Sequence, residues 1–245
     1  MNNCAIEICG LTKKYKDVTA VDNFSLDVPK GSLTALLGVN GAGKTTLIGM
    51  LSGVIRPDSG DARLLGHSIT GDVTAAKRLL SVSPQESAVA PRLTVKENLM
   101  LMAEIYGKDR KAAANAAEAM IAEFDLSGIR DKFAGKLSGG WQRRLSIAMA
   151  LISGPEILFM DEPTLGLDVL ARRGLWEMIR KLRGRVTILM TTHYLEEAEA
   201  LSDCIAIMRS GRLVSAGTAR ELTALAGKDN FEDAFVAFST MQGRE

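Results

Sequence analysis

A glycine-rich segment, Gly38-Val-Asn-Gly-Ala-Gly-Lys-Thr-Thr46, has the spacing of a loop that binds phosphate groups. Its glycines allow the backbone to curl so that successive N–H groups point inward, where an anion can accept their hydrogen bonds. Lys44 can then reach the β- and γ-phosphates of a nucleotide, and Thr45 can offer its hydroxyl to Mg²⁺. A glycine-rich turn with a solvated lysine is the simpler alternative. The residues expected to contact the nucleotide are Gly38, Asn40, Gly41, Ala42, Gly43, Lys44, Thr45 and Thr46.

Two adjacent carboxylates, Asp161 and Glu162, directly follow the apolar residues 157–160. Carboxylates at the carboxyl end of a buried strand are costly unless something cationic meets them, and Mg²⁺ carried by a nucleotide does so. We expect Asp161 to orient the water shell of the metal and Glu162 to accept a proton from the attacking water. The alternative is an ordinary surface turn.

Two further polar residues follow strands that should end at the same edge of the sheet. His193 follows the apolar segment 187–192, which places it near the transferred phosphoryl group, and Gln85 ends the segment 81–85, where it can link the metal site to the region beyond. Taken alone, each residue is more often structural. The expected metal-site residues are Thr45, Gln85 and Asp161, and the expected catalytic residues are Lys44, Gln85, Glu162 and His193.

A second candidate anion site lies in Leu137-Ser-Gly-Gly-Trp141. We expect Ser138 to cap a helix whose first residues lack side chains, so that the helix N-terminus is open to an anion. The helix is expected to be strongly amphipathic from Gln142 to Ile152 and to end at Gly154-Pro155. One chain would therefore carry two helix ends that bind phosphate.

Strands and helices that alternate along the chain must hold these residues in place. The apolar residues 33–37 precede the glycine-rich segment, and apolar residues at helical spacing follow it, which predicts a strand, a turn and a helix. Further buried strands are predicted at 157–160, 186–190 and 205–208. A helix capped by Asp168 and ending at Gly184 is predicted between the first and second of these strands. Another helix, starting near His193, is predicted between the second and third. This order predicts a doubly wound α/β fold.

Two other regions have a different character. Alternating apolar residues between 6 and 28 predict antiparallel strands. In the middle of the chain, the capping box Thr94-Val-Lys-Glu97, a stop at Gly107 and an alanine-rich segment from 109 to 125 predict helices only. We therefore expect a helical insertion over about residues 87–137.

Composition excludes several classes of protein. The chain has 245 residues, 47% of them hydrophobic, which is enough to form a full core. Its net charge of +1 gives no overall electrostatic attraction to nucleic acid or to an anionic membrane. The longest apolar run, 147–152, is much shorter than the roughly 20 residues that a membrane span needs. We therefore expect a soluble cytosolic chain, with Cys4, Cys9 and Cys204 as reduced thiols.

The order of these motifs resembles the nucleotide-binding subunit of ATP-binding cassette (ABC) transporters along the whole chain. The resemblance implies an α/β fold with a P-loop NTPase (RecA-like) core, residues 1–86 and 138–245, that includes an N-terminal antiparallel β subdomain, and an α-helical subdomain, 87–137, inserted into it. Tyr15, which alone is either a half-exposed ring or a platform for a base, then resembles the adenine-stacking aromatic. The motifs that match the family's Walker A, Q-loop, signature, Walker B, D-loop and switch histidine are Gly38–Thr46, Gln85, Ser138-Gly139-Gly140, Asp161-Glu162, Leu165–Asp168 and His193.

The resemblance implies ATP and Mg²⁺ as ligands, held between two cassettes that dimerise head to tail as a homodimer or a heterodimer. It also implies a separate membrane permease, which places the chain on the cytoplasmic face of the cell membrane, without nucleic acid and with membrane contact only through the permease. The segments 94–106 and 231–235 are similar to those of exporters. Trp141 departs from the usual glutamine of the signature. The alternatives are a soluble ATPase of this superfamily that acts on DNA or ribosomes, and a nucleotide-binding regulator without hydrolysis, which Glu162 and His193 disfavour.

Overall fold

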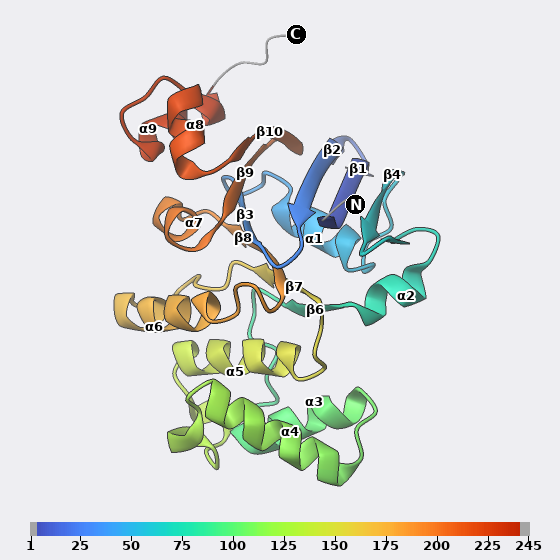
Figure 1. The fold of residues 1–245 in the computed structure, drawn as a ribbon, viewed down its shortest axis with the longest axis vertical. Helices are drawn as coiled ribbons and strands as arrows, with labels where there is room; N and C mark the ends of the chain where they lie inside the picture. The colour runs from blue at the N-terminus through green and yellow to red at the C-terminus, as the bar shows by residue number, and fades with distance from the viewer. Residues whose placement is uncertain (1–3, 241–245) are drawn as a thin grey trace.

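The computed structural model describes residues 4–240, which include a six-stranded sheet (Figure 1). The strand order is β10-β9-β3-β8-β7-β6, and all neighbours are parallel except β9 and β10. The central strands β3, β7 and β8 are buried at every position, as expected for a parallel sheet covered on both faces. The strands are β3 Leu33–Leu37, β6 Leu80–Ser83, β7 Ile157–Asp161, β8 Thr187–Thr192, β9 Cys204–Arg209 and β10 Arg212–Gly217.

An antiparallel sheet of order β2-β1-β4-β5 lies against one face of this sheet, with helix α1 between them (Figure 1). The antiparallel strands expected between 6 and 28 are confirmed as β1 and β2. Leu36 of β3 packs into this layer, whereas Leu33, Ala35 and Leu37 pack on the opposite face, as the period of a strand requires. The elements are β1 Cys4–Tyr15, β2 Val18–Pro29, α1 Lys44–Leu51, β4 Ser59–Leu64, β5 His67–Ser68 and α2 Val73–Arg78.

Helices cover the other face of the six-stranded sheet. Helix α5 lies between α6 and the pair α3 and α4, which form the end of the molecule farthest from the antiparallel sheet (Figure 1). The C-terminal helices α8 and α9 lie near β9 and β10. The helices are α3 Val95–Ile105, α4 Arg110–Glu123, α5 Gly139–Leu151, α6 Val169–Arg180, α7 Leu195–Leu201, α8 Ala219–Leu225 and α9 Phe231–Thr240. Across residues 4–240, none of the helices combines the length and apolar character that crossing a membrane requires.

Two expectations about helices were wrong. Helix α5 is not strongly amphipathic, because α3 and α6 contact it as well as the sheet, so that even Arg143 and Ser146 are buried. Its start at Gly139, directly after Ser138, is as the sequence predicts. Helix α6 ends at Arg180 rather than at Gly184, whose positive φ of 77° belongs to the turn before β8.

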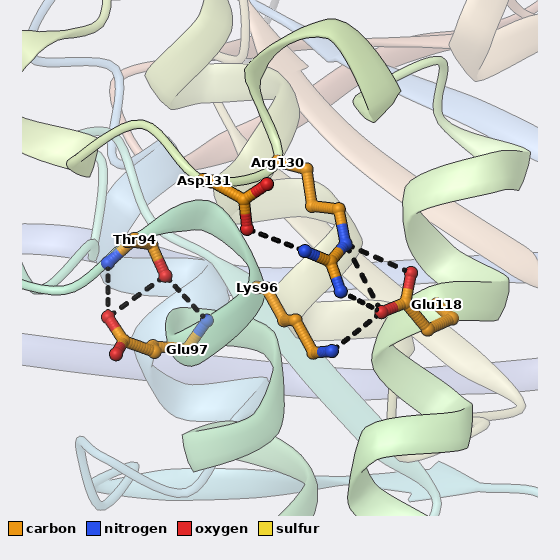
Figure 2. Close-up of polar contacts among 6 residues, drawn as sticks. All are labelled: Thr94, Lys96, Glu97, Glu118, Arg130 and Asp131. Atoms are coloured by element: carbon orange, nitrogen blue, oxygen red, sulfur yellow. Dashed lines mark hydrogen bonds and ion pairs between the residues drawn. The ribbon is translucent and has the colours of Figure 1, made fainter.

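The helix signals of α3 and α4 are confirmed, and an ion-pair network joins these two helices (Figure 2). Thr94 and Glu97 form the reciprocal capping box that the sequence predicts. Glu118 of α4 accepts hydrogen bonds from Arg130 and lies 2.7 Å from Lys96 of α3, and these cations lower its pKa from 4.5 to about 2. The network therefore ties both helices to the segment that follows α4.

We expect Glu118→Gln to destabilise the chain slightly at neutral pH. Because the folded state lowers the pKa of Glu118, the ionised carboxylate adds to the free energy of unfolding. This contribution is complete above about pH 4.5 and is lost as the pH falls toward 2. Glu118 is largely exposed, so the free energy of unfolding should fall by no more than about 1 kcal/mol. Urea unfolding at about pH 7 and pH 3 measures the difference, with Glu104→Gln on α3 as the control. An equal difference at both pH values would contradict this reading.

Candidate active site

The glycine-rich segment forms the loop between β3 and α1, as its sequence predicts. Gly43 lies at the N-cap of α1 with a φ of 105°, and a Cβ there would approach Ala20 O to 2.1 Å. A Cβ on Gly38 would lie 2.4 Å from Met208 O. Only glycine therefore fits at these two positions, and the close approach lets the loop curl around an anion at the start of the helix.

A cleft of about 640 Å³ opens above this loop. It brings together residues from the loop, from the end of β6 and from the edge where β7 and β8 end, so that Gln85, Glu162 and His193 line one cleft. The lining residues are Val18, Thr19, Ala20, Asn40, Gly41, Ala42, Gly43, Lys44, Thr45, Thr46, Gln85, Glu162, Leu165, His193 and Ser210.

Glu162 is the centre of the polar contacts in the cleft. One carboxylate oxygen lies 3.4 Å from Lys44 Nζ, and the other lies 2.8 Å from His193 Nδ1. Because a carboxylate only accepts, Nδ1 carries the proton of this hydrogen bond. Glu162 has a φ of 45°, a left-handed conformation that costs about 1–3 kcal/mol in a residue other than glycine. The turn after β7 is therefore strained, and in this strained conformation the Glu162 carboxylate contacts Lys44 and His193.

Lys44 is buried and donates to the carbonyl oxygens of Gly38 at 2.7 Å and Val39 at 3.2 Å. The ammonium group thus lies inside the curl of the loop and close to Glu162. A cation held between backbone carbonyls and one carboxylate is positioned to meet phosphate oxygens that enter the loop.

Asp161 is buried, and the hydroxyl of Thr191 on β8 donates to its carboxylate. Together with the Thr45 hydroxyl and the Gln85 amide, it offers the hard oxygen ligands that Mg²⁺ prefers. Within residues 4–240, no three His, Cys, Asp or Glu side chains gather as a metal cage. A single carboxylate with a hydroxyl fits Mg²⁺, which usually keeps several waters and takes its other ligands from phosphates.

The second candidate anion site lies outside this cleft. Ser138 occupies the N-cap position of α5 with extended backbone, but its side chain makes no capping bond, so the expected cap was wrong. The glycines pack closely instead: a Cβ on Gly140 would lie 2.8 Å from the Ala171 Cβ of α6. Ser138 is exposed, and neither it nor the first residues of α5 line the cleft at the Lys44 loop of the same chain.

Four other expected site residues also lie outside the lining of the cleft: Gly38, Asp161, Tyr15 and Asp168. Tyr15 is 45% exposed at the end of β1, paired with the cleft residue Val18. Asp168 caps α6 by accepting a hydrogen bond from the N–H of Ala171 at 2.9 Å. Thr191 and Arg143, which contact the backbone or side chains of Asp161 and Glu162, have no signal in the sequence because both resemble ordinary strand and helix residues.

Comparison with known proteins shows the family of the chain. A family described as "ABC transporter" matches residues 21–165. The chain belongs to the ABC transporter family. It is 42% identical to the daunorubicin/doxorubicin resistance ATP-binding protein DrrA of Streptomyces peucetius, over 92% of this chain and 68% of that protein. It is 39% identical to the Nod factor export ATP-binding protein I of Burkholderia pseudomallei, over 91% and 73%.

Solved structures agree with the fold. The structure of an ATP-binding subunit of an ABC transporter has a TM-score of 0.83 and 27% identity, over 96% of this chain and 99% of that one. The expected P-loop α/β fold, the family and the ATPase activity of an ABC transporter subunit are thereby confirmed, and a soluble ATPase acting on DNA or ribosomes is not favoured.

Trp141, the departure from the ABC signature, packs its partly buried ring against the core and lies 4.9 Å from the Arg144 guanidinium. We expect Trp141→Gln to change the steady-state ATPase rate by less than about tenfold, because the indole contacts its own core and Arg144, and an ordinary hydrogen bond gained or lost there is worth only about 0.5–1.5 kcal/mol. Trp176→Gln, on α6, is the control for loss of a partly buried indole. A change of a hundredfold in Trp141→Gln alone would show that position 141 contacts nucleotide.

Proposed function

We propose that this chain is the ATP-hydrolysing subunit of an exporter, in which two cassettes dimerise head to tail around two MgATP and drive a separate membrane permease. The observation that carries hydrolysis is the contact of Glu162 with both Lys44 and His193 inside the phosphate-loop cleft. Export is supported by the relative that is named for Nod factor export.

In the proposed reaction, Lys44 and the N–H groups of the loop bind the β- and γ-phosphates, and Glu162 accepts a proton from the attacking water. The imidazole of His193 donates a hydrogen bond from Nδ1 to the Glu162 carboxylate and so holds it in place. Thr45, Gln85 and Asp161 would hold Mg²⁺, which neutralises phosphate charge when bound.

The separation of the two candidate anion sites supports the proposed dimer. Ser138, Gly139 and Gly140 do not line the cleft of their own chain, so they are free to close over the nucleotide of a second cassette, identical or different. Asp168 would lie at the same interface, and Tyr15 would stack on the adenine at the outer end of the cleft.

The division of labour along the chain is part of the proposal. Residues 1–86 and 138–245 form the nucleotide-binding core, and the helical subdomain 87–137 moves with Gln85 to contact the permease. The chain would then lie on the cytoplasmic face of the membrane, would contact it only through the permease and would need no nucleic acid.

The test is the ATPase rate of the purified chain as its concentration is raised, with Mg²⁺ and with excess EDTA. If each site needs two chains, the rate per chain should rise with concentration and then level off, and EDTA should abolish it. A rate per chain that stays constant while gel filtration shows monomers would contradict the dimer. Stimulation by DNA or ribosomes, rather than by membranes that contain the permease, would contradict the transport role.

A further inference from the structure

Arg143, on the second turn of α5, has a guanidinium that is buried among backbone carbonyls of the active site. It is 3% exposed. Its Nε donates to Pro163 O at 2.7 Å, and its Nη2 donates to Glu162 O at 2.7 Å and Asp161 O at 3.2 Å. Its Nη1 donates to Pro84 O, in the residue before Gln85. One side chain therefore joins the turn after β7 to the segment after β6.

These bonds explain how the turn after β7 keeps its strained shape. The backbone carbonyls of residues 161, 162 and 163 can all accept hydrogen bonds from one planar guanidinium only if the chain bends sharply between them. The positive φ of Glu162 makes this bend. The Glu162 N–H is held from the other side by the hydroxyl and the carbonyl of Thr191. The backbone of Glu162 is thus fixed on both sides, and its carboxylate is aimed at Lys44 and His193.

The charge of Arg143 suits this role. Among the ion pairs of residues 4–240, none within 4.0 Å includes Arg143, so the carbonyl dipoles are its direct partners. Burial lowers the pKa of Arg143, while the nearby carboxylates of Asp161 and Glu197 raise it. An arginine stays charged even so, and a buried cation bonded to carbonyls holds them strongly.

We propose that Arg143 is a positioning residue that holds Glu162 in its catalytic orientation and couples it to the Gln85 segment and to helix α5. Arg143 lies five residues after Ser138 on the same helix. A movement of the α5 N-terminus, when it engages the nucleotide of the second cassette, therefore reaches Glu162 of its own chain through one rigid element. The coupling between sites rests on the proposed dimer, whereas the contact with the turn of Glu162 does not.

The test compares Arg143→Met and Arg143→Lys with wild type in kcat, KM and the Kd for ATP. Methionine fills a similar volume but cannot donate the hydrogen bonds of the guanidinium. We therefore expect kcat to fall about a hundredfold, as when a catalytic group is misplaced, while the Kd for ATP changes less than about threefold. Lysine keeps charge but not the fork, and should restore part of kcat. Arg180→Met is the control, since Arg180 also donates to a backbone carbonyl, that of Ala200, but on the exposed surface of α6.

A double substitution separates positioning from general stability. If Arg143 acts through Glu162, adding Arg143→Met to Glu162→Gln should lower the residual rate less than about twofold, because residues that act as a unit are not additive. A further loss of about a hundredfold, or unchanged kcat in Arg143→Met, would overturn the proposal. If circular dichroism shows that Arg143→Met is unfolded, Arg143→Lys carries the same comparison. A wild-type chain without turnover would instead overturn the proposed function, and this inference with it.

Discussion

Glu162→Gln is expected to slow ATP hydrolysis by roughly 10²–10⁴ while ATP stays bound. The amide has the shape of the carboxylate and can still accept a hydrogen bond from His193 Nδ1, now 2.8 Å from Glu162, but it cannot take a proton from water. Steady-state ATPase assays and ATP titration measure the two effects separately.

The same variant should accumulate as an ATP-bound dimer on gel filtration, because the step that would open the dimer is blocked. Glu199→Gln, on the exposed side of α7, is the matched control and should hydrolyse ATP at the wild-type rate. If Glu162→Gln stayed monomeric with millimolar ATP and Mg²⁺ and turned over normally, another group would be the base.

Ser138→Arg is expected to lower ATPase activity by more than about a hundredfold without lowering the stability of the monomer. Ser138 is exposed and its hydroxyl makes no capping bond, so arginine can be accommodated in the free chain. In the proposed dimer, however, the bulky cation would occupy the space that the opposing γ-phosphate must enter. Thermal melting should therefore be unchanged, and ATP affinity of the monomer should stay within about threefold.

A mixing experiment makes this prediction sharper. Ser138→Arg has an intact phosphate loop, whereas Lys44→Ala has an intact α5 N-terminus, so a mixed dimer contains one complete site. Mixing the two inactive chains should restore turnover that neither has alone. Ser138→Ala is the control for loss of the hydroxyl only and should lower turnover much less than Ser138→Arg does. Near-normal turnover of Ser138→Arg, or no recovery on mixing, would mean that other residues face the second nucleotide.

Local patterns in the sequence were sufficient where a few neighbouring residues decide the structure. The glycines at 38, 41 and 43, the lysine after them and the apolar run before them define a strand, a turn and a helix start within one short segment. The Thr94 capping box is likewise complete within four residues. The edge position of Glu162 and His193 followed from strand ends alone, because parallel strands place their carboxyl ends together.

Tertiary structure alone decided the contacts between segments far apart in the chain. An arginine in a helix is usually exposed, and the sequence around Arg143 predicts nothing else. Because α5 is buried between the sheet, α3 and α6, Arg143 instead donates hydrogen bonds to carbonyls 18 to 59 positions away in the sequence. The same burial made the expected amphipathic stripe wrong. Tyr15 lies beside the cleft rather than in its lining because the pairing of β1 with β2 brings Val18 and its neighbours to the loop. Such contacts depend on which elements pack together, which the local period of a sequence does not encode.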